Sequence, residues 1–134
     1  SSGGLYALSA LDGRTIWQRD IFGISAIRPF QGSLYLASQS GIFRVNADTG
    51  RTIWQNLVRK EALISEIALG KNHIYASVQR LGIVVLDRVK GDLKFTIDHG
   101  SDYTSAPILT DGVLTFMSNR STIYRYTLDD SPLL

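Results

Sequence analysis

The stretch Gly13-Arg14-Thr15-Ile16-Trp17 recurs residue for residue as Gly50-Arg51-Thr52-Ile53-Trp54. A looser third copy runs from Gly91 to Phe95, again with an aromatic side chain four positions after a turn glycine. Agreement of this kind between distant segments indicates an internal repeat, and a repeat has to be recognised before any single element is interpreted.

Short apolar segments that precede these turns fix the length of the repeat. Each segment carries an aromatic residue or valine at its centre, at positions 6, 43, 84 and 124, so that the period is about forty residues. The four segments are Gly4–Leu8, Gly41–Val45, Gly82–Leu86 and Thr122–Tyr126.

Each repeat contains two further apolar segments. Together with the segment before the glycine turn and the segment after it, they predict four strands per repeat. The longer ones are Gly32–Ser38, Asn72–Ser77 and Gly112–Ser118. Shorter ones lie ahead of them, at Ala26-Ile27, Ile67–Leu69 and Pro107–Leu109.

Alternation of side chains identifies these segments as strands. Leu34 and Leu36 share one face of a strand, Tyr35 and Ala37 share the other, and both faces are apolar. Strands that are apolar on both faces are typical of sheets packed between neighbouring sheets. Gln31-Gly32, Gly70–Asn72 and Asp111-Gly112 are expected to supply the positive φ angles of hairpin turns.

Stacked four-stranded antiparallel units of about forty residues are typical of β-propeller blades. We therefore predict an all-β fold, a partial propeller of about three to four blades in one domain. The expected divisions are 1–21 (the third and fourth strands of a blade), 22–57, 58–98 and an incomplete last blade, 99–134. Because both end sheets would expose apolar faces, the remaining blades of the same propeller or a second copy are expected to cover them.

Residues 5 to 17 and 42 to 54 resemble the pattern Leu-Tyr-Ala-Leu-Asp-Ala-x-Thr-Gly-x-x-x-Trp of the PQQ-like, or quinoprotein-type, β-propeller repeat family. In residues 83 to 95 Phe95 replaces the tryptophan, and residues 123 to 128 match only the first part. The resemblance implies that the aromatic residue docks each blade onto its neighbour. The residues expected to do so are Trp17, Trp54, Phe95, Gly13, Gly50 and Gly91.

Two branches of that family imply different functions, since one fold hosts many functions. The BamB-like branch, which we favour, implies a non-enzymatic, periplasmic scaffold in outer-membrane protein assembly, with the outer-membrane assembly machinery as its protein partner. The other branch implies a PQQ-dependent dehydrogenase, which holds its quinone and a calcium ion on the propeller axis. Acidic residues such as Glu61, Glu66, Asp98 and Asp102 lack metal-ligand spacing, so no cofactor and no catalytic residue are expected. A propeller sensor domain of a signalling protein is a third possibility.

Composition narrows the choice of partner. The net charge of +2 comes from basic residues interleaved with acidic ones, without the basic block expected of a nucleic-acid-binding protein. No apolar run approaches the roughly 20 residues that span a bilayer. There is no cysteine, and neither His73 nor His99 stands in a catalytic motif.

A protein partner is expected to bind the loops that differ between repeats, because the strands themselves stay alike. The variable connections are residues 20–25, 58–64 and 99–105, which should share a face with residues 39–40, 79–81 and 119–121. Candidate partner-binding residues on that face are Arg59, Lys60, Arg80 and Arg120, which would make it locally basic.

Overall fold

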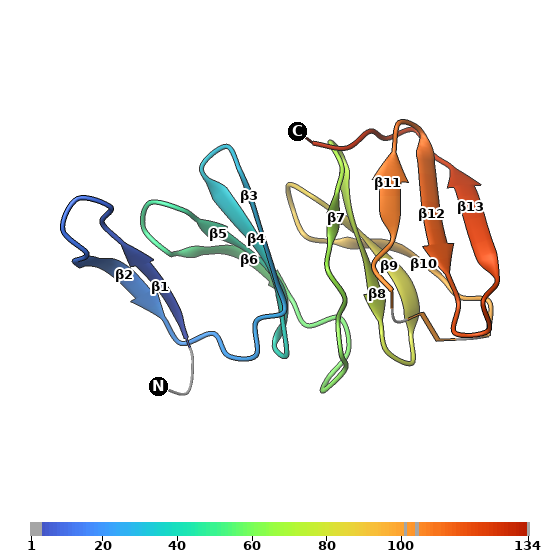
Figure 1. The fold of residues 1–134 in the computed structure, drawn as a ribbon, viewed down its shortest axis with the longest axis horizontal. Coiled ribbons are helices and arrows are strands. Elements are labelled where there is room, and N and C mark those ends of the chain that lie inside the picture. Colours follow the sequence, from blue (N-terminus) through green and yellow to red (C-terminus); the bar gives the residue numbers. More distant parts are fainter. Residues whose placement is uncertain (1–3, 101, 104, 134) are drawn as a thin grey trace.

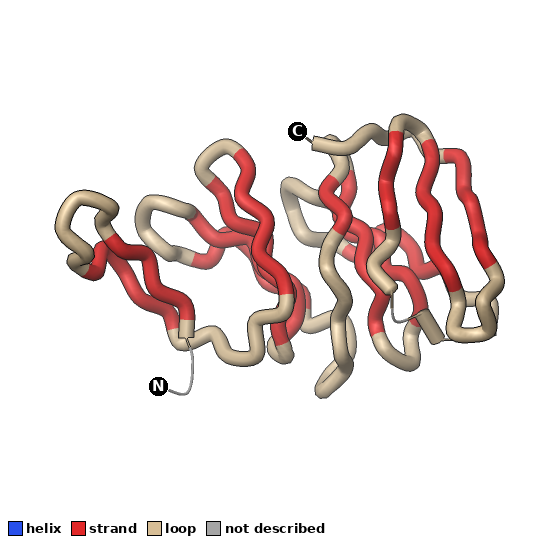
Figure 2. Tube along the Cα trace, in the orientation of Figure 1, coloured by secondary structure: helices blue, strands red, loops and turns tan. Residues whose placement is uncertain are grey.

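The computed structural model describes residues 4–100, 102–103 and 105–133. These residues form strands and loops, with no helix among them, and the strands belong to four antiparallel sheets. The sheets stand side by side in a row from the N-terminal to the C-terminal end (Figures 1 and 2). None of the described residues forms a helix that could cross a membrane. The fold is thus all-β and propeller-like, as the repeats predict.

We call the four sheets blades 1 to 4. Blade 1 consists of β1 (Leu5–Leu8) and β2 (Thr15–Arg19). Blade 2 consists of β3 (Ala26–Phe30), β4 (Ser33–Ser38), β5 (Gly41–Asn46) and β6 (Thr52–Asn56). Blade 3 consists of β7 (Ala68–Leu69), β8 (His73–Val78), β9 (Gly82–Asp87) and β10 (Leu93–Ile97). Blade 4 consists of β11 (Ile108–Thr110), β12 (Val113–Met117) and β13 (Ile123–Thr127).

Consecutive strands pair in every blade, so each sheet is a meander. A shift of register recurs at the same point in the first three blades, where the strand carrying the docking aromatic leaves the turn. The shifts lie between Ala7 and Leu8, Arg44 and Val45, and Leu93 and Phe95. A bulge of this kind bends a strand and re-aims its side chains, and here it precedes or includes each docking aromatic.

Apolar side chains are buried mainly between blades, in three clusters. The first, between blades 1 and 2, contains Trp17 and Phe43; the second, between blades 2 and 3, contains Tyr35 and Ile74. The third fills the space between blades 3 and 4. Because burial of one large apolar side chain contributes about 1.5–3 kcal/mol, each blade depends on its neighbours for most of its stability.

Two of the three expected positive-φ turns are present. Gln31 and Gly32 have φ angles of 44° and 77°, and Gly112 has 75°. The expectation for Gly70–Asn72 was wrong, because none of these three residues has a positive φ angle. Contacts of Gly70 with the C-terminal segment explain its glycine instead, as described below.

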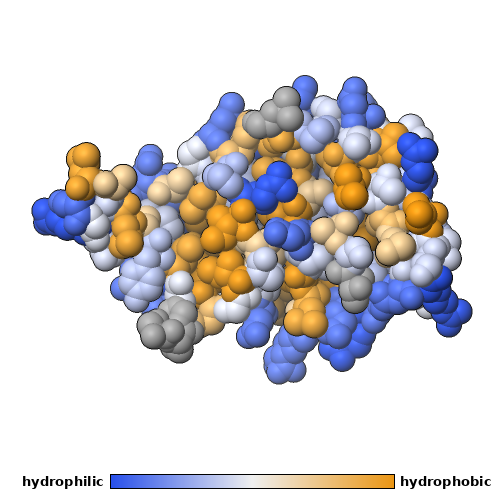
Figure 3. Space-filling model, viewed as in Figure 1, coloured by the Kyte–Doolittle hydropathy of each residue, from blue (hydrophilic) through white to orange (hydrophobic). Residues whose placement is uncertain are grey.

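Both ends of the row present apolar side chains to solvent. Tyr6 and Ile16 of blade 1 are 48% and 60% exposed, and Ile108 and Ile123 of blade 4 are 62% and 65% exposed. Apolar atoms are visible at the end of the row that holds blade 1 (Figure 3). These sheets lack the cover that neighbouring blades give to blades 2 and 3.

Candidate functional site

Trp17 joins blade 1 to blade 2. Its indole N–H donates a hydrogen bond to the carbonyl of Ala47 at 2.9 Å, and the side chain is 9% exposed. The ring lies directly over Gly50, so that a Cβ atom at Gly50 would come within 2.5 Å of Cε3 of Trp17. Glycine is needed at this position for two reasons. The φ angle of Gly50 is 76°, and a side chain there would clash with the indole ring.

Trp54 joins blade 2 to blade 3 in the same way. Its indole N–H donates to the carbonyl of Arg88 at 3.1 Å, and the ring covers Gly91 so closely that a Cβ atom there would overlap it. The side-chain amide of Asn56 adds a hydrogen bond to the carbonyl of Gly91 at 3.0 Å. Repetition in two successive interfaces identifies this arrangement as structural, and a ligand site would seldom repeat with the blades.

Phe95 and Gly13 occupy the corresponding positions without their partners. The Phe95 side chain is 43% exposed, because blade 4 has no glycine turn beneath it within the described residues. Gly13 has the φ angle of a docking glycine, 75°, yet nothing lies within 4 Å of a Cβ atom placed there. Of the six predicted docking residues, four therefore meet in pairs and two do not.

The connections between blades meet the hairpin tips of the same sheets at one end of the molecule, which we call the loop face. The backbone N–H of Gln79 donates to the carbonyl of Leu63 at 2.9 Å. Asp102 accepts hydrogen bonds from the N–H groups of Arg80, at its side chain, and of Asn119, at its carbonyl, both at 2.9 Å. These bonds fix two of the three variable loops, those that contain Leu63 and Asp102, against hairpin tips of blades 3 and 4.

One hollow of about 440 Å³ lies between the hairpin tips of blades 3 and 4. It brings together Arg80 and Arg120, two of the four predicted partner-binding residues, and it also contains Asp98 and Asp102. Among the described residues, no carboxylate lies within 4.0 Å of either guanidinium group. Both arginines are exposed, and Asp98 and Asp102 line the same hollow.

A second hollow of about 260 Å³ and a third of about 720 Å³ continue the loop face toward blade 2. Lys60 and Glu61 line the third one, whereas Arg59 lines none of these three hollows. The loop face is thus mixed in charge, with Arg80 and Arg120 the two predicted basic residues that the fold brings together.

Leu63 was not predicted from the sequence, yet it lies where the second and third hollows meet. Its side chain is 68% exposed, and the residues just before it include two non-glycine positions with positive φ, Val58 at 63° and Glu61 at 57°. Such backbone is costly for a β-branched residue. An exposed leucine within a polar interblade loop is the signal that could have identified it.

The histidines occupy structural positions. His73 lies 3.5 Å from the carboxylate of Asp130, and His99 stacks on Tyr124 with ring centroids 4.1 Å apart. The backbone N–H of His99 donates to the hydroxyl of Tyr103, and burial raises the pKa of that phenol. Within the described part of the chain, no group of three or more His, Cys, Asp or Glu side chains could hold a metal ion.

Solved structures with low sequence identity share this fold. The computationally designed Ika4 protein matches with a TM-score of 0.78 and 17% identity, over 95% of this chain and 81% of that one. BamB from Moraxella catarrhalis matches with a TM-score of 0.72 and 16% identity, over 100% of this chain and 42% of that one. PorZ of Porphyromonas gingivalis, a surface component of a type-IX secretion system, matches with a TM-score of 0.60 and 15% identity, over 91% of this chain and 19% of that one.

The chain therefore spans less than half the length of the two natural proteins. Comparison with curated proteins finds no match. At the level of sequence, residues 38–132 match the family described as outer membrane protein assembly factor BamB. Because that match covers well over half of the 134 residues, the chain belongs to this BamB-type family of PQQ-like repeat proteins.

Proposed function

We propose that this protein is a non-catalytic propeller scaffold that binds a protein partner through its loop face, in the periplasm, in support of outer-membrane protein assembly. Membership of the BamB-type family and the structural similarity to BamB support this proposal. Since the chain corresponds to 42% of that BamB, the role is proposed for the propeller to which these blades belong.

The observation that carries the proposal is the row of three hollows on the loop face, the second and third of which meet at Leu63. Protein interfaces are stabilised by a few anchors that insert into pockets, surrounded by a polar rim. Leu63 provides an exposed apolar anchor, and Arg80 and Arg120 provide donors that form no ion pair within the part of the chain that the structure describes. Geometry and chemistry on this face therefore suit a protein surface with an apolar pocket and an acidic rim.

Site-specific photo-crosslinking in cells tests the proposal. A photoreactive residue in place of Leu63 is expected to capture one defined protein, whereas the same residue in place of Leu11 is expected to capture none. Leu11 is a matched control because it is even more exposed, at 96%, but lies in the turn between β1 and β2, outside all the loop-face hollows. Equal capture at both positions, or none at Leu63, would contradict the proposal.

A second measurement separates loss of binding from loss of folding. Leu63→Asp is expected to abolish capture by a photoreactive residue at position 80 while leaving the unfolding midpoint within a few degrees of the original. A change at an exposed loop position typically alters stability by about 0.5 kcal/mol or less. Unchanged capture by this variant would show that Leu63 is not the anchor.

A further inference from the structure

After β13 the described residues form no fourth strand beside blade 4. Instead residues Asp129–Leu133, which we call the strap, run back to blade 3 and end beside β7 (Figure 1). The N–H of Lys71 donates to the carbonyl of Ser131, and the N–H of Leu133 donates to the carbonyl of Leu69, both at 2.9 Å. With the antiparallel bridge between Gly70 and Pro132, the strap pairs with the edge of β7 that faces away from β8.

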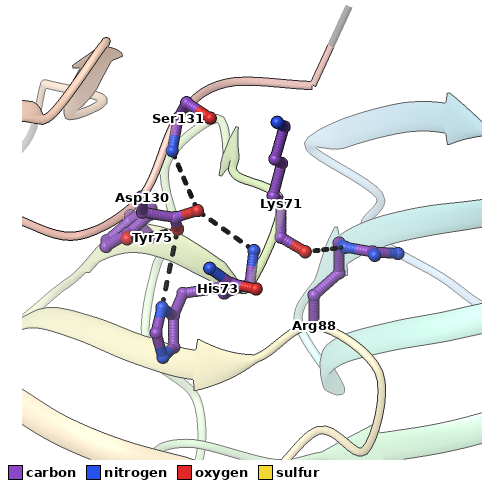
Figure 4. A network of polar contacts seen from close by, with 7 residues as sticks. Lys71, His73, Tyr75, Arg88, Asp130 and Ser131 are labelled. Carbon is purple, nitrogen blue, oxygen red and sulfur yellow. Dashed lines mark hydrogen bonds and ion pairs between the residues drawn. The ribbon is translucent and has the colours of Figure 1, made fainter.

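Asp130 fastens the strap. Its side chain is 1% exposed, and one carboxylate oxygen accepts hydrogen bonds from the N–H groups of Asn72 and Ser131, at 3.1 and 3.0 Å. The other oxygen accepts the hydroxyl of Tyr75 at 2.6 Å and lies 3.5 Å from Nδ1 of His73 (Figure 4). Hydrogen bonds to an ionised acceptor are about twice as strong as neutral ones, so this carboxylate is the strongest single attachment of the strap.

Two other features show that the edge of β7 and the residues around it are shaped to hold the strap. We call this binding site the seat. Leu133 packs against the apolar cluster between blades 2 and 3, which includes Leu69. A Cβ atom at Gly70 would overlap an oxygen of Asp130, so the glycine leaves the space that the carboxylate fills. The seat therefore combines a free strand edge, a set of donors for one carboxylate, and a notch for one aliphatic side chain.

The strap forms two backbone hydrogen bonds with residues 69 and 71, whereas β4 in blade 2 pairs along its whole length with β3 and with β5. Segments with few buried contacts open locally at a lower free energy than the core of the fold. When the strap opens, it uncovers the unpaired backbone groups of β7 together with an apolar notch. Exposed strand edges recruit other extended segments by forming the same backbone hydrogen bonds.

We propose that the strap is a releasable segment that occupies, within its own chain, a strand-addition seat at the free edge of β7. The seat accepts an extended peptide with an acidic residue three positions before an aliphatic one, as Asp130 stands before Leu133. The donors of Asn72 and Tyr75 select the acidic residue, and the cluster between blades 2 and 3 selects the aliphatic one.

Hydrogen exchange in the full chain tests whether Asp130 holds the strap. In Asp130→Ala the amides of Lys71 and Leu133 are expected to exchange at least tenfold faster, while those of Val84 and Leu86 in β9 keep their rates. Asp129→Ala is the matched control, since Asp129 is exposed, and it should leave all four rates unchanged. Unchanged exchange at Lys71 and Leu133 would overturn the proposal, and so would an equal increase in β9.

Peptide binding then tests the seat itself. A labelled peptide, Leu-Asp-Asp-Ser-Pro-Leu-Leu, is expected to bind the Asp130→Ala protein saturably and the original protein at least tenfold more weakly. A peptide with alanine in place of its second aspartate should lose this binding. Gly70→Ala, which crowds the carboxylate position, should release the strap yet bind the peptide poorly. Equal binding to both proteins, or none to a variant whose strap exchanges freely, would overturn the proposal.

Discussion

The interface between blades 2 and 3 differs from the one between blades 3 and 4, although both follow the same repeat. In the first, Trp54 is 9% exposed, donates to the carbonyl of Arg88 and covers Gly91. In the second, the Phe95 side chain is 43% exposed and has no N–H group to donate. Ile97 occupies the position that corresponds to Asn56, whose side-chain amide makes a polar contact in the first interface.

Blade 4 is held by other means. His99, Phe116 and Tyr124 stack on one another, and Tyr103 meets Phe116 edge to face, with ring centroids 5.3 Å apart. Aromatic pairs of this kind add about 0.5–1.5 kcal/mol beyond the area they bury. An aromatic docking residue is thus effective only when the next blade supplies its glycine turn, and where the turn is missing a different cluster joins the sheets.

Removal of the docking aromatic should show the largest difference between the two interfaces. Trp54→Ala leaves a cavity and an unused carbonyl, so we expect a loss of about 3–5 kcal/mol of unfolding free energy. Phe95→Ala removes a side chain that is already partly solvated, and we expect a loss of roughly 1–2 kcal/mol. Urea titration of both variants measures the difference, and equal losses would contradict the distinction between docked and undocked aromatics.

A pair of glycine variants tests the other half of the docking contact. Gly91→Ala combines an unfavourable φ angle with a clash against Trp54, and we expect it to cost about 3 kcal/mol or more. Gly13→Ala carries a similar φ angle in open space, and we expect only the backbone cost of roughly 1–2 kcal/mol. Thermal unfolding should therefore separate two chemically identical substitutions, and coincident melting curves would show that Trp54 adapts.

A rise in pH should destabilise blade 3 where it contacts the strap. The group responsible is Tyr75, which lies in blade 3 and is buried against Asp130 of the strap. Burial, together with the hydrogen bond to Asp130 and its negative charge, raises the pKa of this phenol above the ordinary value of 10.0. Its stabilising contribution is therefore complete below that value and is lost as pH rises beyond it. The unfolding free energy should therefore fall as pH rises above 10.0, and that of Tyr75→Phe should fall less steeply. Parallel curves would contradict this.

The smallest effect on stability is expected on the loop face. Arg80→Ala should change unfolding free energy by no more than about 0.5 kcal/mol, because its side chain is exposed and forms no ion pair with the described residues. Binding of the partner captured at Leu63 should nevertheless weaken. Arg59→Ala is the control, since Arg59 lines none of the loop-face hollows, and equal weakening by both would show that only overall charge matters.

Local rules allowed the fold to be predicted from the sequence, whereas most of the candidate site could not be. The repeat from Gly13 to Trp17 and the alternation in β4 are encoded within a few residues, so they identify strands and turns directly. Two features of the site depend on how successive blades are placed relative to one another. Arg80 and Arg120 line the same hollow, and Leu63 lies where two hollows meet. The role of Asp130 was missed for the same reason, because its partner Tyr75 lies 55 positions away.

The register shifts that recur in blades 1, 2 and 3 have a further consequence for cooperativity. In blades 1 and 2 the shift lies beside Trp17 and Trp54, which pack on Gly50 and Gly91 of the next blade, so these docking contacts run from neighbour to neighbour along the row. Repeat proteins built in this way behave like a one-dimensional chain of coupled units, in which each unit has its own stability and each junction its own coupling energy. A weakened junction therefore divides the molecule into two unfolding units instead of loosening it uniformly.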